Sequence, residues 1–432
     1  MEDIVNGKVY QLAHGSKAVL MMLTHIIQPF APVYGTSVVT YTLRAYLKAG
    51  WTFYIVAGFK PKPVDNELVK QLHISWFGGS LLDTLRILGE RVRKIGFFFR
   101  AVWWVIAQAL FFINGFCIIS QRKVDLIYTW GEFASPAAWA LSKLFGIPWV
   151  ARYLGTYVPI CDQKKKVLWR IRFWQEILAY KLPADLIIMT NDGTQGDRVL
   201  QHMGVKMEKV RFWLNGVNWE SFHFMPQSQE AKALLNLGDK YVLLCLSRLH
   251  RWKRVDRALQ ALPSVLKSFS NVVLVIVGDG PERKRLEQLA LELGCREHVR
   301  FEGAIPHSEV PKYLAAADIF LSLYDLSNVV NPLFEAMMAG KCIVTLNNGD
   351  TRRFIRNGEN GVLLECEDLH KLPEVIKELL ANEELRNRLG TNARRFAEEN
   401  FWSWEERLDV EIAEVSRLVE QQEKRRYGYG TE

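Results

Sequence analysis

The sequence predicts an α/β protein made of two domains, each built around a parallel β-sheet. Short apolar runs alternate with helical segments along most of the chain, a pattern typical of parallel sheets with right-handed crossovers. The chain has 432 residues, which is enough for two domains of ordinary size. A polar stretch at residues 226–232 is suited to a linker between them.

The N-terminal half is predicted to begin with strands at residues 18–23 and 53–57, separated by a helix at 37–47. Further apolar runs at 124–128 and 185–189 predict two more strands, and we expect the second of these to be the last strand of the domain.

The C-terminal half shows the clearer strand pattern. Its predicted strands lie at residues 241–246, 272–277, 299–303, 319–323, 342–346 and 362–364. An amphipathic helix begins at Trp404, since apolar residues recur after it at helical spacing. We therefore expect an N-terminal domain over residues 1–222, a C-terminal domain over 223–403, and a final helix with a tail over 404–432.

A short helix near residue 335 carries the most informative signal. Asn331 and Pro332 are typical of a helix start, with asparagine as the cap and proline at the first position, and Gly340 suits the end. Glu335 lies one turn into this helix, whose N-terminus favours anions. A carboxylate does not bind phosphate, because like charges repel. We therefore expect Glu335 to accept hydrogen bonds from sugar hydroxyls that lie beside a phosphate group. Phosphate together with sugar suggests a nucleotide-sugar.

Two basic residues strengthen this interpretation. Arg248 and Lys253 follow the predicted strand at 241–246, where a guanidinium and an ammonium group can neutralise a diphosphate. Taken alone, these residues are equally compatible with a solvated basic turn. Glu335 downstream favours the phosphate interpretation.

These motifs resemble the donor-binding signature of the group 1 (family 4) retaining glycosyltransferases, which have the GT-B fold. Arg248 and Lys253 match the family's Arg-Leu-x-x-x-Lys element, and Glu335 matches the second of two glutamates seven residues apart. The resemblance implies two Rossmann-like domains facing across a cleft, with the C-terminal helix crossing back to the N-terminal domain. It also implies sugar transfer with retention of configuration, with no cofactor and no obligatory metal.

The resemblance assigns roles residue by residue. Arg248, Lys253 and Glu335 are the expected catalytic residues, with Glu335 on the ribose. The expected donor-binding residues are Gly35, Gly278, Gly280, Ala304, Ile305, Ser327, Val330, Asn331 and Glu335. On the acceptor side we expect Trp130, Glu132 and Arg152.

The chain departs from the family pattern at two positions. Ser327 stands where the family has its first glutamate, which contacts hydroxyls of the donor sugar. Leu154 precedes Gly155 where many relatives have a histidine that reaches the transferred sugar. His307 is expected to begin a helix rather than to act in catalysis.

Composition indicates anionic partners and a reducing compartment. The net charge of +8 favours nucleotides, anionic lipid or nucleic acid. The six cysteines form no Cys-x-x-Cys pair, and we expect all of them to be reduced, which points to the cytoplasm and to no structural zinc. The N-terminus shows no secretory signal.

Two segments indicate contact with a membrane. Residues 101–119 are nearly all apolar, include Trp103 and Trp104, and are flanked by basic residues at both ends, which fits a helix in the cytoplasmic interface. A second run mixes cations with aromatic rings, and its expected membrane residues are Lys165, Trp169, Arg170, Arg172 and Trp174. Core packing and a solvated basic helix are the alternatives. Nucleic acid is disfavoured because no reading module accompanies these residues.

The sequence therefore predicts a glycosyltransferase, peripheral on the inner face of the membrane, that moves a sugar from a nucleotide-sugar to a lipid-linked or other saccharide acceptor. The alternatives are a non-catalytic GT-B protein that binds nucleotide-sugars or serves as a scaffold, and a nucleotide-sugar epimerase. The sequence leaves open the donor, the acceptor and the oligomeric state.

Overall fold

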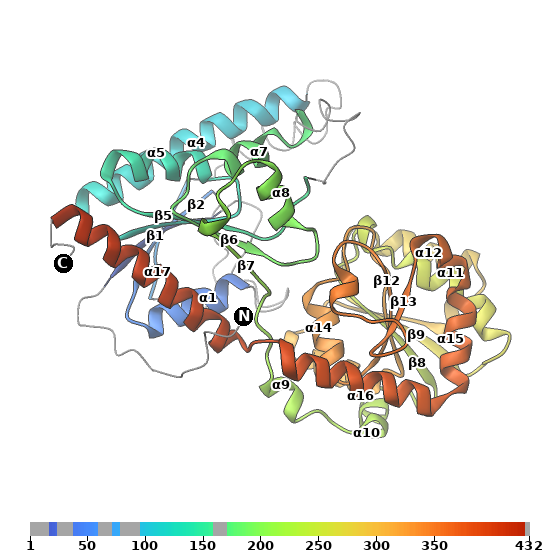
Figure 1. Cartoon of the computed structure of the whole chain (residues 1–432). Helices are drawn as coiled ribbons and strands as arrows, with labels where there is room; N and C mark the ends of the chain where they lie inside the picture. The colour runs from blue at the N-terminus through green and yellow to red at the C-terminus, as the bar shows by residue number, and fades with distance from the viewer. Residues whose placement is uncertain (1–16, 24–37, 59–70, 78–95, 159–170, 428–432) are drawn as a thin grey trace.

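The computed structural model describes residues 17–23, 38–58, 71–77, 96–158 and 171–427. These residues form two lobes, each with one parallel sheet covered by helices (Figure 1). The arrangement confirms the predicted α/β fold with two Rossmann-like domains.

The N-terminal lobe contains a sheet of seven strands among the described residues. In spatial order they are β3 (His73–Trp76), β2 (Thr52–Ala57), β1 (Ala18–Leu23), β4 (Leu126–Trp130), β5 (Trp149–Tyr153), β6 (Leu186–Thr190) and β7 (Val210–Trp213). Every pairing is parallel, so the carboxyl ends of the strands share one edge.

The C-terminal lobe contains a sheet of six strands among the described residues. In spatial order they are β10 (Val299–Gly303), β9 (Val272–Val277), β8 (Tyr241–Leu246), β11 (Ile319–Ser322), β12 (Cys342–Leu346) and β13 (Val362–Leu364). The pairings are again parallel. Side chains of β9, β11 and β12 are buried along their whole length, as expected of strands covered on both faces.

Helices connect these strands. The described α-helices are α1 (Val38–Lys48), α4 (Gly96–Gln121), α5 (Ser135–Phe145), α7 (Trp174–Lys181), α8 (Gly196–His202), α9 (Glu220–His223), α10 (Ser228–Leu234), α11 (Asp256–Leu266), α12 (Arg283–Glu292), α13 (Val310–Ala316), α14 (Asn331–Met338), α15 (Leu372–Ala381), α16 (Glu383–Asn400) and α17 (Trp404–Tyr427). The short 3₁₀ helices are η3 (Met207–Lys209), η4 (Arg251–Lys253), η5 (Arg296–His298), η6 (His307–Glu309), η7 (Thr351–Arg353) and η8 (Cys366–Lys371).

Two predictions about the join between the lobes were wrong. The strand at 185–189 is not the last of the N-terminal sheet, because β7 pairs with β6 beyond it. As an edge strand, β7 has only one buried side chain and therefore a weak apolar signal. The supposed linker at 226–232 is largely helix α10, whose Ala231 is buried in the core of the C-terminal lobe.

Helix α17 returns from the C-terminal lobe and lies along α1 of the N-terminal lobe, which confirms the predicted crossover (Figure 1). The Trp404 ring at its start stacks on Tyr41 of α1, with ring centroids 4.6 Å apart. Further along, Glu411 is completely buried and bonds to Arg152 of β5 at 2.5 Å and to Arg407 at 3.0 Å. The long helix is thus fixed to the N-terminal sheet by an ion network.

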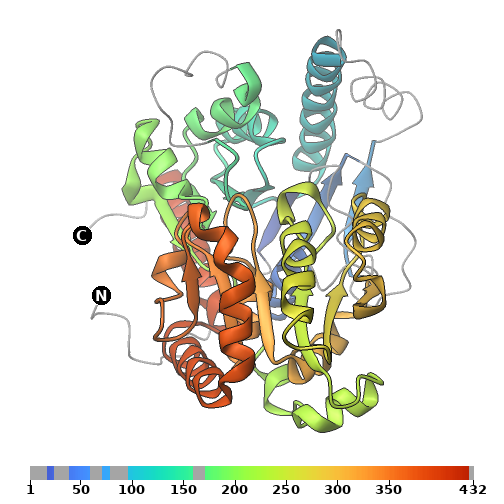
Figure 2. The ribbon, with the colours of Figure 1, turned by 90° about the vertical axis from the view of Figure 1, so that its right-hand side faces the viewer.

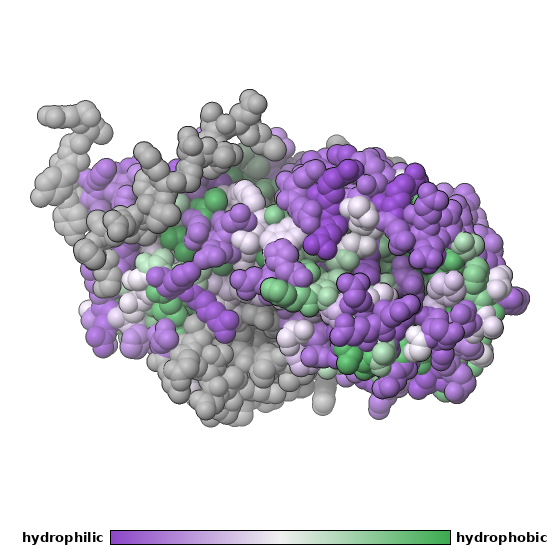
Figure 3. Space-filling model, turned by 90° about the horizontal axis from the view of Figure 1, so that it is seen from below, coloured by the Kyte–Doolittle hydropathy of each residue, from purple (hydrophilic) through white to green (hydrophobic). Residues whose placement is uncertain are grey.

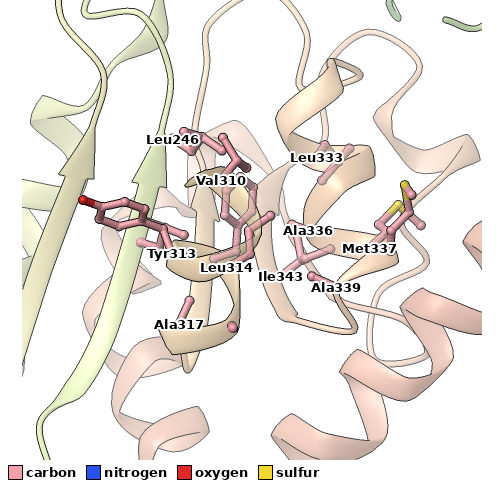
Figure 4. Close-up of a cluster of buried hydrophobic side chains, with 14 of the residues drawn as sticks. Leu246, Val310, Tyr313, Leu314, Ala317, Leu333, Ala336, Met337, Ala339 and Ile343 are labelled. Carbon is pink, nitrogen blue, oxygen red and sulfur yellow. The ribbon is translucent and has the colours of Figure 1, made fainter. Parts of the chain in front are cut away.

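The core of the C-terminal lobe holds α14 in place. Side chains of α13 and α14, among them Leu314, Leu333 and Ala336, gather with Leu246 of β8 and Ile343 of β12 (Figure 4). All five are buried. This packing fixes the start of α14 and the loop before it.

Helix α4 covers one face of the N-terminal sheet and has two contrasting sides. Trp104, Ala107 and Phe111 point into the core. On the opposite side an outer stripe stays exposed, formed by Val105, Ile106, Ile113 and Phe116. Figure 2 shows α4 in cyan, rising above the C-terminal lobe. Figure 3 shows the face of the molecule that lies opposite α4, and this face is mostly hydrophilic over the C-terminal lobe.

Among the described residues, one helical segment, Ala101–Gln121 of α4, is long and apolar enough to cross a membrane. Its inner side is nevertheless used to cover the sheet. Five cysteines are described and all five are free thiols, as predicted.

Candidate functional site

The two lobes touch where the loop after β6 meets two loops of the C-terminal lobe. The carbonyl oxygen of Gly193 accepts a hydrogen bond from the Asp350 N–H at 3.0 Å, and Gln195 Nε2 donates to Asp350 Oδ1 at 3.0 Å. Gly193 has a φ of +76°, and a Cβ here would lie 2.2 Å from Ser327 Oγ, so only glycine permits this contact. We call this region the seam; it consists of residues 192–195, 327–329 and 349–350.

Lys253, at the end of η4, is the central cation beside the seam. It is 7% exposed, and its Nζ lies 3.7 Å from the ring centroid of Tyr324 and 4.0 Å from that of Trp252. Burial, together with the positive charge of Arg248, lowers the pKa of Lys253 to about 7, although Asp192 opposes this shift. The ammonium group has no ion pair among the described residues, so it is suited to an incoming anion.

Gly278 and Gly280 lie beneath the loop that carries Arg248. Gly278 has a φ of +131°, and a Cβ here would be 1.9 Å from the carbonyl oxygen of Ser247. A Cβ on Gly280 would be 2.5 Å from the carbonyl oxygen of Leu249. The glycines therefore let two backbone turns pack together, and this packing sets the position of the exposed Arg248 side chain.

Glu335 is buried on α14 and is paired with a histidine. His307 Nε2 lies 2.8 Å from Glu335 Oε1, and this bond raises the pKa of His307. As predicted, His307 begins a short helix, η6. The exposed Ala304 and the half-buried Ile305 lie just before it.

The predicted capping role of Asn331 was wrong. The cap position of α14 is Val330, and no side chain caps the helix. Asn331 is instead the first helical residue, and its Oδ1 accepts a hydrogen bond from Asn215 Nδ2 at 3.3 Å. The side chain is thus used to link the two lobes rather than to satisfy its own helix.

The acceptor-side predictions need correction for two of three residues. Arg152 and Trp130 are both completely buried, with the guanidinium 4.9 Å from the Trp130 ring centroid. Arg152 is already bonded to Glu411, so neither residue can contact an acceptor. Glu132 is exposed.

The predicted membrane residues differ in how far they are buried. Trp104 is buried and contacts Trp174 at 4.8 Å between ring centroids, so the expectation that it lies at a membrane surface was wrong. Trp103 and Trp174 are half-buried against the same core, and Arg172 is exposed. The predicted residues Gly35, Lys165, Trp169 and Arg170 lie outside the described part of the chain.

Sequence reasoning missed Asp192 and Tyr157, which reach the site from the N-terminal lobe. Asp192 follows β6, and polar residues at the carboxyl ends of parallel strands often form sites, so this position offered a signal. The exposed Tyr157 lies near Arg248 and offered none. The part of the chain that the structure describes has no group of three His, Cys, Asp or Glu placed to hold a metal.

The low pKa of Lys253 predicts how diphosphate binding depends on pH. A bound anion favours the protonated amine, so the pKa of Lys253 rises on binding and affinity is highest below pH 7. We expect UDP or GDP, whichever binds, to bind about fivefold more weakly at pH 8 than at pH 7, and about ninefold more weakly again at pH 9. Calorimetry over this range, where the terminal phosphate is already mostly ionised, measures the change.

Lys253→Arg is the matched control for this pH dependence, because guanidinium keeps its charge throughout. Its diphosphate affinity should hardly change between pH 7 and pH 9. An equal loss of affinity in both proteins would show that another group titrates. His250 does not confuse the test, since burial and its cationic neighbours lower its pKa from 6.5, below this range.

The sequence matches two family models that together span most of the chain. Residues 227–396 match "Glycosyl transferases group 1", and residues 35–221 match "Glycosyltransferase Family 4". A curated relative from Mycolicibacterium smegmatis, a GDP-mannose-dependent alpha-(1-6)-phosphatidylinositol monomannoside mannosyltransferase, is 30% identical over 200 residues. That alignment covers 44% of this chain and 52% of the relative, so the match spans about half the length of the relative.

Solved structures resemble the whole fold. Sucrose-phosphate synthase from Thermosynechococcus elongatus has a TM-score of 0.69 at 20% identity, covering 93% of this chain and 98% of that one. Anabaena Alr3699/HepE, solved in complex with UDP and glucose, has a TM-score of 0.67 at 17% identity, covering 92% and 99%. The two family models follow each other along the chain, and the structure has two lobes, each with a parallel sheet, joined by a returning helix. The chain therefore belongs to the group 1 glycosyltransferases of the GT-B fold.

Proposed function

We propose that the chain transfers a sugar from a nucleotide-sugar to an acceptor, with retention of configuration and without an obligatory metal. The observation that carries this proposal is Lys253, a buried cation without an ion pair among the described residues, which lies next to Arg248 beside the seam. A protein gains nothing in stability from burying an unpaired ammonium group. Such a group is suited to an anion that arrives from solution.

The proposed chemistry is mainly electrostatic. When the bond between sugar and diphosphate breaks, the diphosphate gains negative charge. Arg248 and Lys253 would stabilise this charge in a site of low dielectric, where preorganised charges contribute most. The α14 N-terminus adds positive potential, because its first N–H groups have no capping side chain. Glu335 would accept hydrogen bonds from the ribose, with His307 holding its other oxygen.

The donor class is tested by a thermal-shift screen with UDP, GDP and ADP and their hexose conjugates. A ligand that binds the native state raises the unfolding temperature according to its affinity. We expect one nucleotide series to stabilise the chain and the other two to do so weakly. Absence of any shift at millimolar concentration would contradict the proposal.

The main alternative is a GT-B protein that binds nucleotide-sugars without catalysis, and the two family departures are the observations that favour it. Ser327 is buried under Gly193, and Leu154 is a half-exposed apolar side chain in place of an imidazole. Slow hydrolysis of the stabilising conjugate in the absence of acceptor would exclude this alternative. A conjugate that binds but stays intact, with or without membrane extract, would support it.

We further propose a lipid-linked saccharide as acceptor and a peripheral position on the cytoplasmic face of a membrane. The outer stripe of α4 places apolar side chains where a soluble helix would have polar ones, and Val105 and Ile113 are 59% and 54% exposed. Exposed cations lie just after α4 (Arg122, Lys123), on the neighbouring α5 (Lys143) and at α7 (Arg172, Lys181). Apolar residues framed by cations match an anionic lipid surface.

The membrane proposal predicts that the chain sediments with phosphatidylglycerol vesicles and that Ile113→Glu with Phe116→Glu prevents this. Fully burying one such side chain contributes about 1.5–3 kcal/mol, so losing two should weaken binding far more than tenfold. Leu291→Glu is the matched control, because Leu291 is a 57% exposed leucine on α12 of the other lobe. Equal sedimentation of all three proteins would refute the role of the stripe.

A further inference from the structure

Asp192 is held firmly by one oxygen and leaves the other open. Its Oδ1 accepts hydrogen bonds from the Thr194 N–H at 3.1 Å and from the Thr194 hydroxyl at 2.5 Å. Its Oδ2 lies against Gly155, where a Cβ atom would be only 1.9 Å away. No group of the described residues donates a hydrogen bond to Oδ2. The carboxylate is therefore oriented by its own loop, with one acceptor unused.

Asp192 follows β6 of the N-terminal lobe, whereas Arg248 and Lys253 belong to the C-terminal lobe. Burial raises the pKa of Asp192 to about 6, against the effects of the Thr194 hydrogen bonds and of the Lys253 charge. The Asp192 carboxylate acts in turn on Lys253, because its negative charge opposes the lowering of the Lys253 pKa. Asp192 and Lys253 thus come from different lobes and interact electrostatically beside the seam.

Three other carboxylates around the seam are likewise hydrogen-bonded through one oxygen. Glu335 is bonded to His307 at 2.8 Å. Asp350 accepts a hydrogen bond from Gln195 at 3.0 Å. Glu176 accepts from Thr156 at 2.6 Å and from Tyr180 at 2.7 Å. Asp192 differs from these three in its electrostatic interaction with Lys253, which belongs to the other lobe.

The C-terminal lobe cannot supply a carboxylate at Ser327. This side chain is 2% exposed, and its Oγ accepts a hydrogen bond from the Val329 N–H at 3.0 Å. Gly193 covers it so closely that not even a methyl group fits between them. The residue before this covering glycine is Asp192, so the loop that closes over Ser327 brings its own carboxylate to the site.

We propose that Asp192 contacts the transferred sugar, accepting hydrogen bonds from its hydroxyl groups through Oδ2 while the cations of the other lobe hold the diphosphate. This assignment rests on the proposed function. As transfer proceeds, the carbon–oxygen bond to the diphosphate breaks and its electron pair leaves with the diphosphate. The acceptor hydroxyl oxygen bonds to the sugar carbon, and its proton passes to the departing phosphate. Asp192 stays unchanged and stabilises the positive charge that develops on the sugar.

The contact is tested by comparing ligands with and without the sugar. We would measure the Kd of UDP, UDP-glucose, GDP and GDP-mannose for the native chain, Asp192→Asn and Asp192→Ala. Both variants should bind the free diphosphate within about twofold of the native Kd, yet bind its hexose conjugate at least about tenfold more weakly, because a charge-assisted hydrogen bond is lost. The kcat of the variants should fall at least about a hundredfold.

Unchanged diphosphate binding also shows that the variants are folded. The assignment fails if conjugate and free diphosphate weaken by the same factor, since Asp192 would then act only on the cations or on the fold. It also fails if Ser327→Ala causes the selective loss while Asp192→Asn behaves like the native chain. If the native chain binds none of the four ligands, the proposed function itself fails, and this assignment with it.

Discussion

Replacing Lys253 with methionine should lower turnover at least about a hundredfold, which corresponds to about 2.7 kcal/mol of lost transition-state stabilisation. Methionine has nearly the same length and suits a buried site between aromatic rings, so the fold should remain intact. The amine has no other described ion pair to break, and its removal relieves an unfavourable burial of charge. We therefore expect the variant to unfold at the native temperature or above it.

Arg248→Ala should cause a loss of similar size, because the two cations act on the same leaving group. Kinetics with the stabilising nucleotide-sugar, and thermal unfolding on the same samples, measure both effects. Arg251→Ala is the matched control: Arg251 is an exposed cation on the same 3₁₀ turn as Lys253. Near-native turnover in Lys253→Met and Arg248→Ala, or an equal loss in Arg251→Ala, would remove the basis for the diphosphate site.

Glu411→Gln should cause the largest loss of stability among single substitutions. Glu411 is 0% exposed and neutralises two buried guanidinium groups, Arg152 and Arg407. It also accepts hydrogen bonds from Tyr128 at 2.7 Å and Tyr46 at 3.3 Å. Although burial alone would raise the pKa of Glu411, the two arginines hold it below its usual value. The side chain is therefore charged at neutral pH, and glutamine would leave two buried cations without a counter-charge.

Removing one partner of a buried ion network costs about 3–5 kcal/mol, and we expect this much loss in the free energy of unfolding of the N-terminal lobe. Urea unfolding followed by tryptophan fluorescence measures it, since Trp130 and Trp213 lie beside the two arginines. Glu414→Gln on the same helix is the control, because its ion pair with Arg211 is partly exposed and should contribute less than about 1 kcal/mol. Equal midpoints for both variants would contradict the proposed role of the network.

The sequence predicted the C-terminal sheet almost to the residue, for a physical reason. Strands such as β9 are buried on both faces, so every position is apolar and the run is unmistakable. The edge strands β3 and β7 escaped prediction or were misassigned because most of their side chains are only partly buried. These two edge strands lack the continuous apolar run by which central strands such as β9 are recognised.

The site was predictable only where its chemistry is local in sequence. Arg248 and Lys253 belong to one turn and could be paired from spacing alone. Arg152 could not be assigned correctly, because its partner Glu411 is 259 positions away and follows no local pattern. Asp192 reaches the site only because the lobes meet at Gly193, which is a tertiary contact. The apolar sequence of α4 likewise does not reveal which of its sides faces the core.

The central claim is that Arg248 and Lys253 hold the diphosphate of a sugar donor beside the seam. A crystal structure of the native chain with the stabilising nucleoside diphosphate tests it most directly. We predict the two phosphates within hydrogen-bond distance of Lys253 Nζ and the Arg248 guanidinium, with the ribose at Glu335. Phosphates bound elsewhere, with the Lys253 amine still enclosed by its two aromatic rings and touching no ligand, would contradict the account.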